Sequence, residues 1–204
     1  STDVIVPYFP QRLLAQLRAP SLFSAVGIDH VNARAGVNEG MAGRVTDALI
    51  RIFVPFRREE RSRNATSNRI TALYGQLYES AQLNSLTFES ALPEMFGEAN
   101  ITAFKQLARI ARTGTIVDAD GGDIYMPHLD RMAFPVTFIH GALNRCFMPE
   151  STARTVAKLS EHNGAGLYDR HVIPGYGHID CIFGKTAATD VYPLILAHLE
   201  RTAT

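Results

Sequence analysis

The sequence of 204 residues is poor in several features that would indicate a class of protein. It has only two cysteines, Cys146 and Cys181, which are too few for a disulfide scaffold and fit a reducing compartment. Its 20 basic residues balance its 20 acidic ones, so charge gives no reason to expect nucleic acid or an anionic membrane as a partner. No apolar run approaches the ~20 residues that a membrane-spanning helix needs. We therefore expect a globular, cytoplasmic protein, and its 46% hydrophobic content is enough for a sizeable core.

The first 130 residues have the apolar periodicity of helices rather than strands. Apolar side chains recur at helical spacing in residues 13–17, 45–53, 70–78 and 104–111. The last of these stretches ends at a Thr-Gly pair, as the C-terminus of a helix commonly does. This part of the chain is predicted to be helical.

Residues 131–204 change to an alternation of strand and helix. Residues 134–141 and 167–173 are predicted strands, while 149–162 and 190–201 are predicted helices. Short connections between them favour an α/β fold with parallel strands. Because parallel sheets are buried on both faces, two strands do not suffice. We expect the sheet to be completed by the N-terminal remainder of the same protein or by a partner chain.

Two loops that follow the predicted strands contain the candidate site residues. The second strand is followed by Pro174-Gly175-Tyr176-Gly177-His178, in which flanking glycines let an imidazole project over the carboxyl edge of the sheet. The first strand stops at Gly141 and is followed by Ala142, Leu143 and Asn144.

These loops and their flanks resemble the C-terminal half of the acid-lipase-like branch of the α/β hydrolases. The resemblance is closest to the hydrolase region fused behind some bacterial cholesterol-oxidase-like GMC flavoproteins. It is carried by residues 135–151 and 173–184, and it continues through residues 190–192 into the last helix. The fold class that it implies is α/β, as the C-terminal portion of an α/β-hydrolase fold with a helical cap.

The resemblance also implies how the chain is divided. Residues 1–130 would be a helical cap region following a core strand, and residues 131–204 a C-terminal core segment. Residues 1–7 would be the end of the sixth strand of the family's sheet. Residues 68–74 and 95–101 would lie in cap helices.

The function implied by the resemblance is ester hydrolysis of lipase type on an apolar ester or other small molecule, with His178 as the base. The sequence contains no Gly-x-Ser-x-Gly turn, so the nucleophilic serine is expected before residue 1. The alternative is a non-catalytic hydrolase-like module for binding or assembly in a GMC-type flavin oxidoreductase. This chain is expected to hold no cofactor, with FAD in a fused or partner region.

Asn144 stands where the family's pattern has the acid that orients the histidine. An amide can accept a hydrogen bond from the imidazole, but it cannot stabilise an imidazolium by charge, and Asp-to-Asn in a serine-protease triad costs about 10⁴ in turnover. Three interpretations stay open. The pair works weakly, a neighbouring carboxylate of Glu150 or Asp180 replaces the amide, or the protein is not hydrolytic.

A zinc site built from Cys146, Cys181, His140 and His178 is a weaker interpretation. Paired Cys-x2-Cys spacing, the strong sign of a zinc site, is missing here, and His178-x2-Cys181 alone is a weak signal. We therefore predict no metal, and we expect both cysteines to be small buried apolar residues.

Overall fold

The computed structural model describes residues 2–5, 18–25, 27, 29–36, 47–48 and 64–202. Its helices are α2 (Ala19–Ala25), α4 (Ala65–Tyr74), α5 (Leu92–Met95), α6 (Ile101–Thr113), α7 (Pro149–Asn163), α8 (Asp180–Phe183), α9 (Ala187–Asp190) and α10 (Tyr192–Thr202). Short 3₁₀ or π turns are η1 (Ser80–Gln82), η2 (Thr87–Ala91), η3 (Met126–Met132) and η4 (Ala165–Leu167). The strands are β1 (His30–Asn32), β2 (Glu98–Asn100), β3 (Val136–Gly141) and β4 (Tyr168–Ile173).

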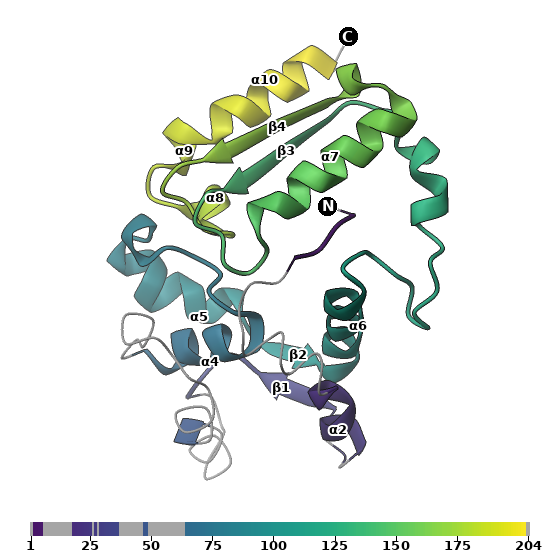
Figure 1. Ribbon diagram of the computed structural model, residues 1–204. Helices are drawn as coiled ribbons and strands as arrows, with labels where there is room; N and C mark the ends of the chain where they lie inside the picture. The colour runs from purple at the N-terminus through teal and green to yellow at the C-terminus, as the bar shows by residue number, and fades with distance from the viewer. Residues whose placement is uncertain are drawn as a thin grey trace.

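The C-terminal part is the strand-helix-strand-helix unit that the sequence predicts. β3 and β4 are parallel, in a register that runs from Val136 opposite Tyr168 to Gly141 opposite Ile173. α7 connects them and lies along one side of the strands, while α10 lies along the other (Figure 1). The two predicted strands and the two predicted helices are confirmed, and the mixed helix and sheet content agrees with the α/β class.

The register leaves one edge of β3 without a partner in the described part of the chain. Ala142 N donates to Ile173 O at 2.9 Å, so the N–H of residue 142 points toward β4. Because the N–H groups of a strand point alternately to its two sides, the N–H of Phe138 also points toward β4, and those of Thr137 and Ile139 point away from it. An edge of this kind is a template for pairing with another strand.

The helices of the N-terminal part begin and end at recognisable capping residues. Asn64 caps α4 by accepting from Ser67 N, and Asn100 caps α6 by accepting from Thr102 N. α6 ends at Gly114, whose left-handed φ of 75° confirms the predicted Thr-Gly terminus. α4 stops at Gly75, which has a φ of 86°, so the apolar stretch at 70–78 is helical only as far as Tyr74.

Two predictions about this part were wrong. Residues 95–101 are not a cap helix, because α5 ends at Met95 and β2 pairs antiparallel with β1 before Asn100 starts α6. The predicted helices at 13–17 and 45–53 lie outside the described residues, apart from the helical residues 47–48.

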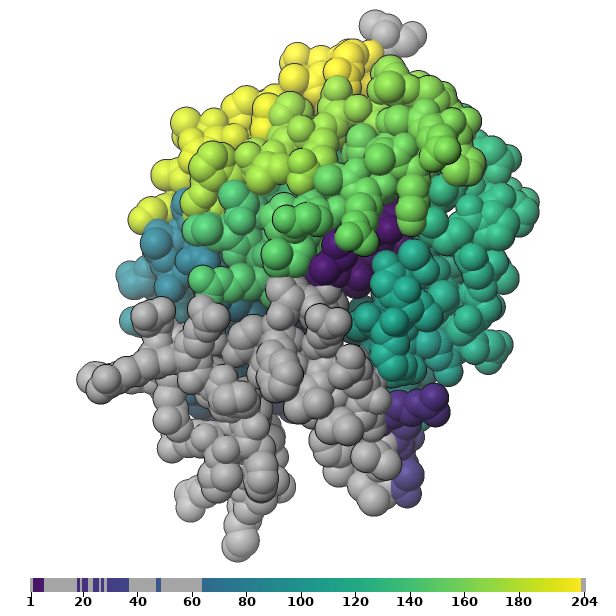
Figure 2. All heavy atoms as spheres, viewed as in Figure 1, coloured from purple at the N-terminus to yellow at the C-terminus, as the bar shows by residue number. Residues whose placement is uncertain are grey.

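The second wrong prediction is the core strand expected at residues 1–7, of which the structure describes residues 2–5. This segment forms one antiparallel bridge, from Asp3 to Thr115, and does not pair with β3. It lies along the polar side of α7, where Ile5 N donates to Ser151 Oγ at 3.0 Å and Lys158 Nζ forms a salt bridge with Asp3 at 2.8 Å. Figure 2 shows it in purple between the green and teal segments.

The largest buried cluster joins the helical part to the loop after β3. Its members are apolar residues of α4 and the following turns, together with Ala33 and Cys146; they are Ala33, Ile70, Leu77, Tyr78, Leu83, Leu92 and Cys146. In the described residues no helix combines the length and apolar character needed to cross a membrane.

Candidate functional site

His178 and Asn144 follow the carboxyl ends of two neighbouring parallel strands. Asn144 lies three residues after the end of β3, and His178 lies five residues after the end of β4. Because these strand ends meet at one edge of the sheet, the two side chains come together, with Asn144 Nδ2 3.2 Å from His178 Nδ1. The predicted contact is therefore confirmed, while a catalytic role for the pair stays a prediction.

A close approach of two glycines makes this meeting possible. A Cβ atom on Gly141 would lie 1.9 Å from the carbonyl oxygen of Gly177 and 2.4 Å from that of Tyr176. The loop of His178 thus crosses directly over the end of β3, and Leu143 N donates to Tyr176 O at 2.8 Å. Only a residue without a side chain fits at position 141 in this arrangement.

The segment after α4 holds the His178 loop from the other side. The backbone N–H groups of His178 and Ile179 both donate to Leu77 O, at 3.0 and 2.9 Å. Gln82 Nε2 donates to Gly175 O at 3.2 Å. The histidine is consequently fixed between the strands and the helical region.

The side chain of Asn144 is buried, and its orientation is set by the backbone. Its Oδ1 accepts hydrogen bonds from Cys146 N and Phe147 N, both at 3.0 Å. An amide oxygen accepts and an amide nitrogen donates, so these two bonds turn the NH₂ group toward His178. His178 Nδ1 must then be the unprotonated, accepting nitrogen, and the neutral ring carries its proton on Nε2.

The electrostatic surroundings favour the neutral ring. His178 is exposed as a residue, yet the packing of protein atoms around its ring lowers its pKa, and the nearby His140 lowers it further. An imidazolium would also point an Nδ1–H at the Asn144 NH₂ group, a donor against a donor. A general base in a serine hydrolase needs the lone pair on Nε2, so the pair as built presents a hydrogen-bond donor instead.

Neither carboxylate considered as a substitute for Asn144 contacts the imidazole. Glu150 is exposed in the first turn of α7. Asp180 is completely buried, and its Oδ2 accepts from Gly177 N at 2.8 Å, which holds the loop just before His178. Burial raises the pKa of Asp180, and its Oδ1 has no hydrogen-bond partner among the described residues.

The cysteines are both buried, as predicted, and burial raises the pKa of Cys146 to about 12 and that of Cys181 to about 11. Thiols with such values are not ionised near neutral pH, so they are poor nucleophiles. Within the residues that the structure describes, no group of three or more histidine, cysteine or acidic side chains could hold a metal ion.

His140 is a residue of this site that the sequence suggested only as a metal ligand. It lies in β3 just before Gly141 and is buried, with its Nε2 3.1 Å from the carbonyl oxygen of Phe147. The aromatic ring of Phe147 in turn packs edge-on against His178, with 5.6 Å between ring centroids. A histidine inside a β-branched run resembles any buried polar residue, so only the folded loop shows this connection.

No family model, curated protein or solved structure matches the chain. The likeness to acid-lipase-like hydrolases therefore stays a prediction from the motif residues.

Proposed function

We propose that this chain is the cap and closing strands of an α/β-hydrolase-type unit that binds an apolar ester or similar carbonyl compound through His178. In this proposal the Nε2–H of the neutral ring donates a hydrogen bond to the carbonyl oxygen of the ligand. The observation that supports it is the orientation of Asn144, whose oxygen accepts from Cys146 and Phe147 and whose NH₂ faces Nδ1.

The surroundings of the ring suit a ligand that is apolar with one polar group. The ring of Phe147 packs against His178. Leu77, whose carbonyl oxygen accepts from His178 N, belongs to the same buried apolar cluster as Ile70. Binding sites for small molecules are commonly mostly apolar with a few placed polar groups. A neutral donor can hold a carbonyl without the cost of burying a charge.

The test uses the intact protein with p-nitrophenyl octanoate as ester and 2-decanone as an unreactive carbonyl probe. We expect His178→Phe to weaken binding of the ketone and of the ester about tenfold each, as for the loss of one hydrogen bond of about 1.4 kcal/mol, without the fall of several orders of magnitude in ester hydrolysis that loss of a base would cause. Lys185→Ala, at an exposed residue just after α8, is the control for general damage. Equal ketone affinity in wild type and His178→Phe would contradict the proposal.

Ester hydrolysis with His178 as base is the second candidate, and the placement of His178 beside Asn144 at the carboxyl edge of parallel strands favours it. It requires a serine from outside these residues. It also requires the Asn144 amide to turn over, which would break both bonds to Oδ1. A fall of several orders of magnitude in ester hydrolysis on His178→Ala would support this candidate against the first. Association with a GMC-type flavin oxidoreductase, which would carry the FAD, is an extension of either proposal.

A further inference from the structure

We propose that His140 is a positioning residue: its hydrogen bond to Phe147 keeps the Asn144 amide in one orientation and thereby keeps His178 in its Nε2–H form. The inference rests on the proposed function, because it concerns the donor state of His178. It assigns a role to a buried histidine that does not touch the proposed ligand.

The proton of His140 is placed by its partner. A backbone carbonyl can only accept, so the 3.1 Å contact with Phe147 O requires the proton on His140 Nε2. Its Nδ1 lies 3.4 Å from Thr152 Oγ1, and that hydroxyl accepts from Arg170 Nε at 2.9 Å. Burial is the largest influence on the pKa of His140 and lowers it; the hydrogen bond to Phe147 O raises the pKa and the Arg170 charge lowers it again, with a net lowering. The ring is therefore a neutral donor to Phe147.

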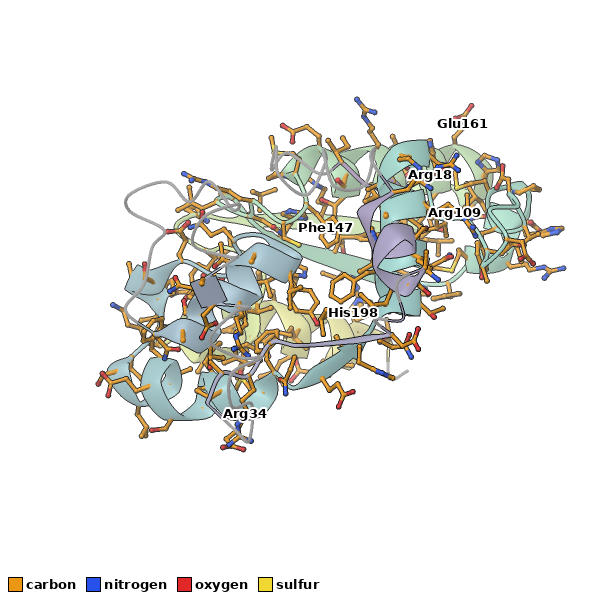
Figure 3. All side chains as sticks on the ribbon, turned by 90° about the horizontal axis from the view of Figure 1, so that it is seen from below. Arg18, Arg34, Arg109, Phe147, Glu161 and His198 are labelled. Carbon is orange, nitrogen blue, oxygen red and sulfur yellow. The ribbon has the colours of Figure 1, made fainter. Side chains whose placement is uncertain are left out.

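Phe147 is the residue through which His140 acts on the pair. Its carbonyl oxygen accepts from His140, its N–H donates to Asn144 Oδ1, and its ring packs against His178. Figure 3 labels the half-buried Phe147, which lies where the strands meet the helical region. One residue of the loop after β3 therefore contacts all three polar side chains of the site.

This connection determines how easily the amide of Asn144 can turn over. In the turned state its NH₂ group would face the N–H groups of Cys146 and Phe147, so two hydrogen bonds would be lost and donors would oppose donors. The loss is avoided only if the backbone at 146–147 moves away from Asn144. The bond from His140 opposes that movement, because it holds the Phe147 peptide to the end of β3.

The test measures the ring nitrogens of His178 in the intact protein, labelled with ¹⁵N-histidine, by long-range ¹H–¹⁵N correlation at pH 7.5. His140→Phe keeps a ring of similar size but removes the donor, whereas His140→Gln keeps an N–H near the position of Nε2. We expect wild type and His140→Gln to show predominantly the Nε2–H form, and His140→Phe to show at least tenfold more of the minor Nδ1–H form than wild type. His162→Gln, on the exposed side of α7, should leave the signals unchanged.

A second variant keeps the test decisive if His140→Phe fails to fold. The amide of His140→Asn is too short to reach Phe147 O, so it should also raise the Nδ1–H form. Wild-type spectra in every folded variant that lacks the donor would overturn the role of His140 and leave the proposed function standing. A wild-type protein that already carries its proton on Nδ1 would overturn the proposed function itself.

Discussion

Replacing Asn144 by aspartate is the most direct perturbation of this site. The two acceptor bonds to Cys146 N and Phe147 N can be kept by one carboxylate oxygen, because they need no donor from residue 144. The other oxygen then occupies the place of Nδ2, 3.2 Å from His178 Nδ1. Since that oxygen can only accept, the proton of the neutral ring has to move from Nε2 to Nδ1.

The size of the effect follows from the charge that is introduced. Two unit charges about 4 Å apart attract by about 4 kcal/mol at an effective dielectric constant of 20, which is an upper limit of about 3 pKa units. Burial disfavours both charges and offsets part of this attraction. The pKa of His178, which is lowered in the wild type, is therefore expected to rise by about 1–2 units in Asn144→Asp.

Long-range ¹H–¹⁵N spectra recorded across a pH titration measure both quantities at once. Asn84→Asp is the matched control, since Asn84 Oδ1 also accepts a backbone N–H, from Thr87, on an exposed turn. The control should change neither the tautomer nor the pKa of His178. If Asn144→Asp kept the proton on Nε2, or if the wild type already had it on Nδ1, the reasoning from amide orientation would be refuted. Ester hydrolysis that rises in this variant, by up to about 10⁴, would further show that a serine is in reach.

Burial lowers the pKa values of His140 and His178, so the folded state binds fewer protons than the unfolded state near pH 6.5. Stability should be full above pH 6.5 and should fall below it by up to about 1.4 kcal/mol per pH unit for the buried His140, and by much less for the exposed His178, whose charge is screened by solvent; urea unfolding at several pH values measures this. Gly141→Ala should destabilise the protein by about 3 kcal/mol, because its Cβ would lie 1.9 Å from a carbonyl oxygen, whereas Gly166→Ala, with open space, should stay within about 0.5 kcal/mol. The N–H of Ile139 should exchange slowly with deuterium in the intact protein if another strand pairs with the open edge of β3, and fast exchange there would show that the edge stays free.

The sequence was most informative where the signal is local. The strands at 134–141 and 167–173 are compact apolar runs bounded by glycines, and α7 and α10 have helical periodicity with clear ends. The contact between Asn144 and His178 could be predicted from their positions in the loops after the two strands, because the carboxyl ends of neighbouring parallel strands meet at one edge of the sheet.

It was least informative where distant backbone groups decide the structure. β1 and β2 are only three residues each, so the one apolar residue in the middle of each strand is too little to predict a strand, and their pairing depends on tertiary contacts such as Ala33 N to Gly97 O. The orientation of the Asn144 amide likewise depends on where Cys146 N and Phe147 N point. No residue pattern reports that direction before the loop has folded.

The choice between a base and a donor at this site comes down to a single atom of residue 144. The backbone that delivers this side chain to His178 is the same for an amide and a carboxylate, and so are the two N–H groups that anchor its first oxygen. A carboxylate would offer a second oxygen to the ring and leave Nε2 free to accept a proton, while the amide offers hydrogens and forces Nε2 to keep one. The strands, the glycine contact and the segment after α4 are therefore compatible with either chemistry, and in the proposed function the Asn144 amide sets the imidazole to donate.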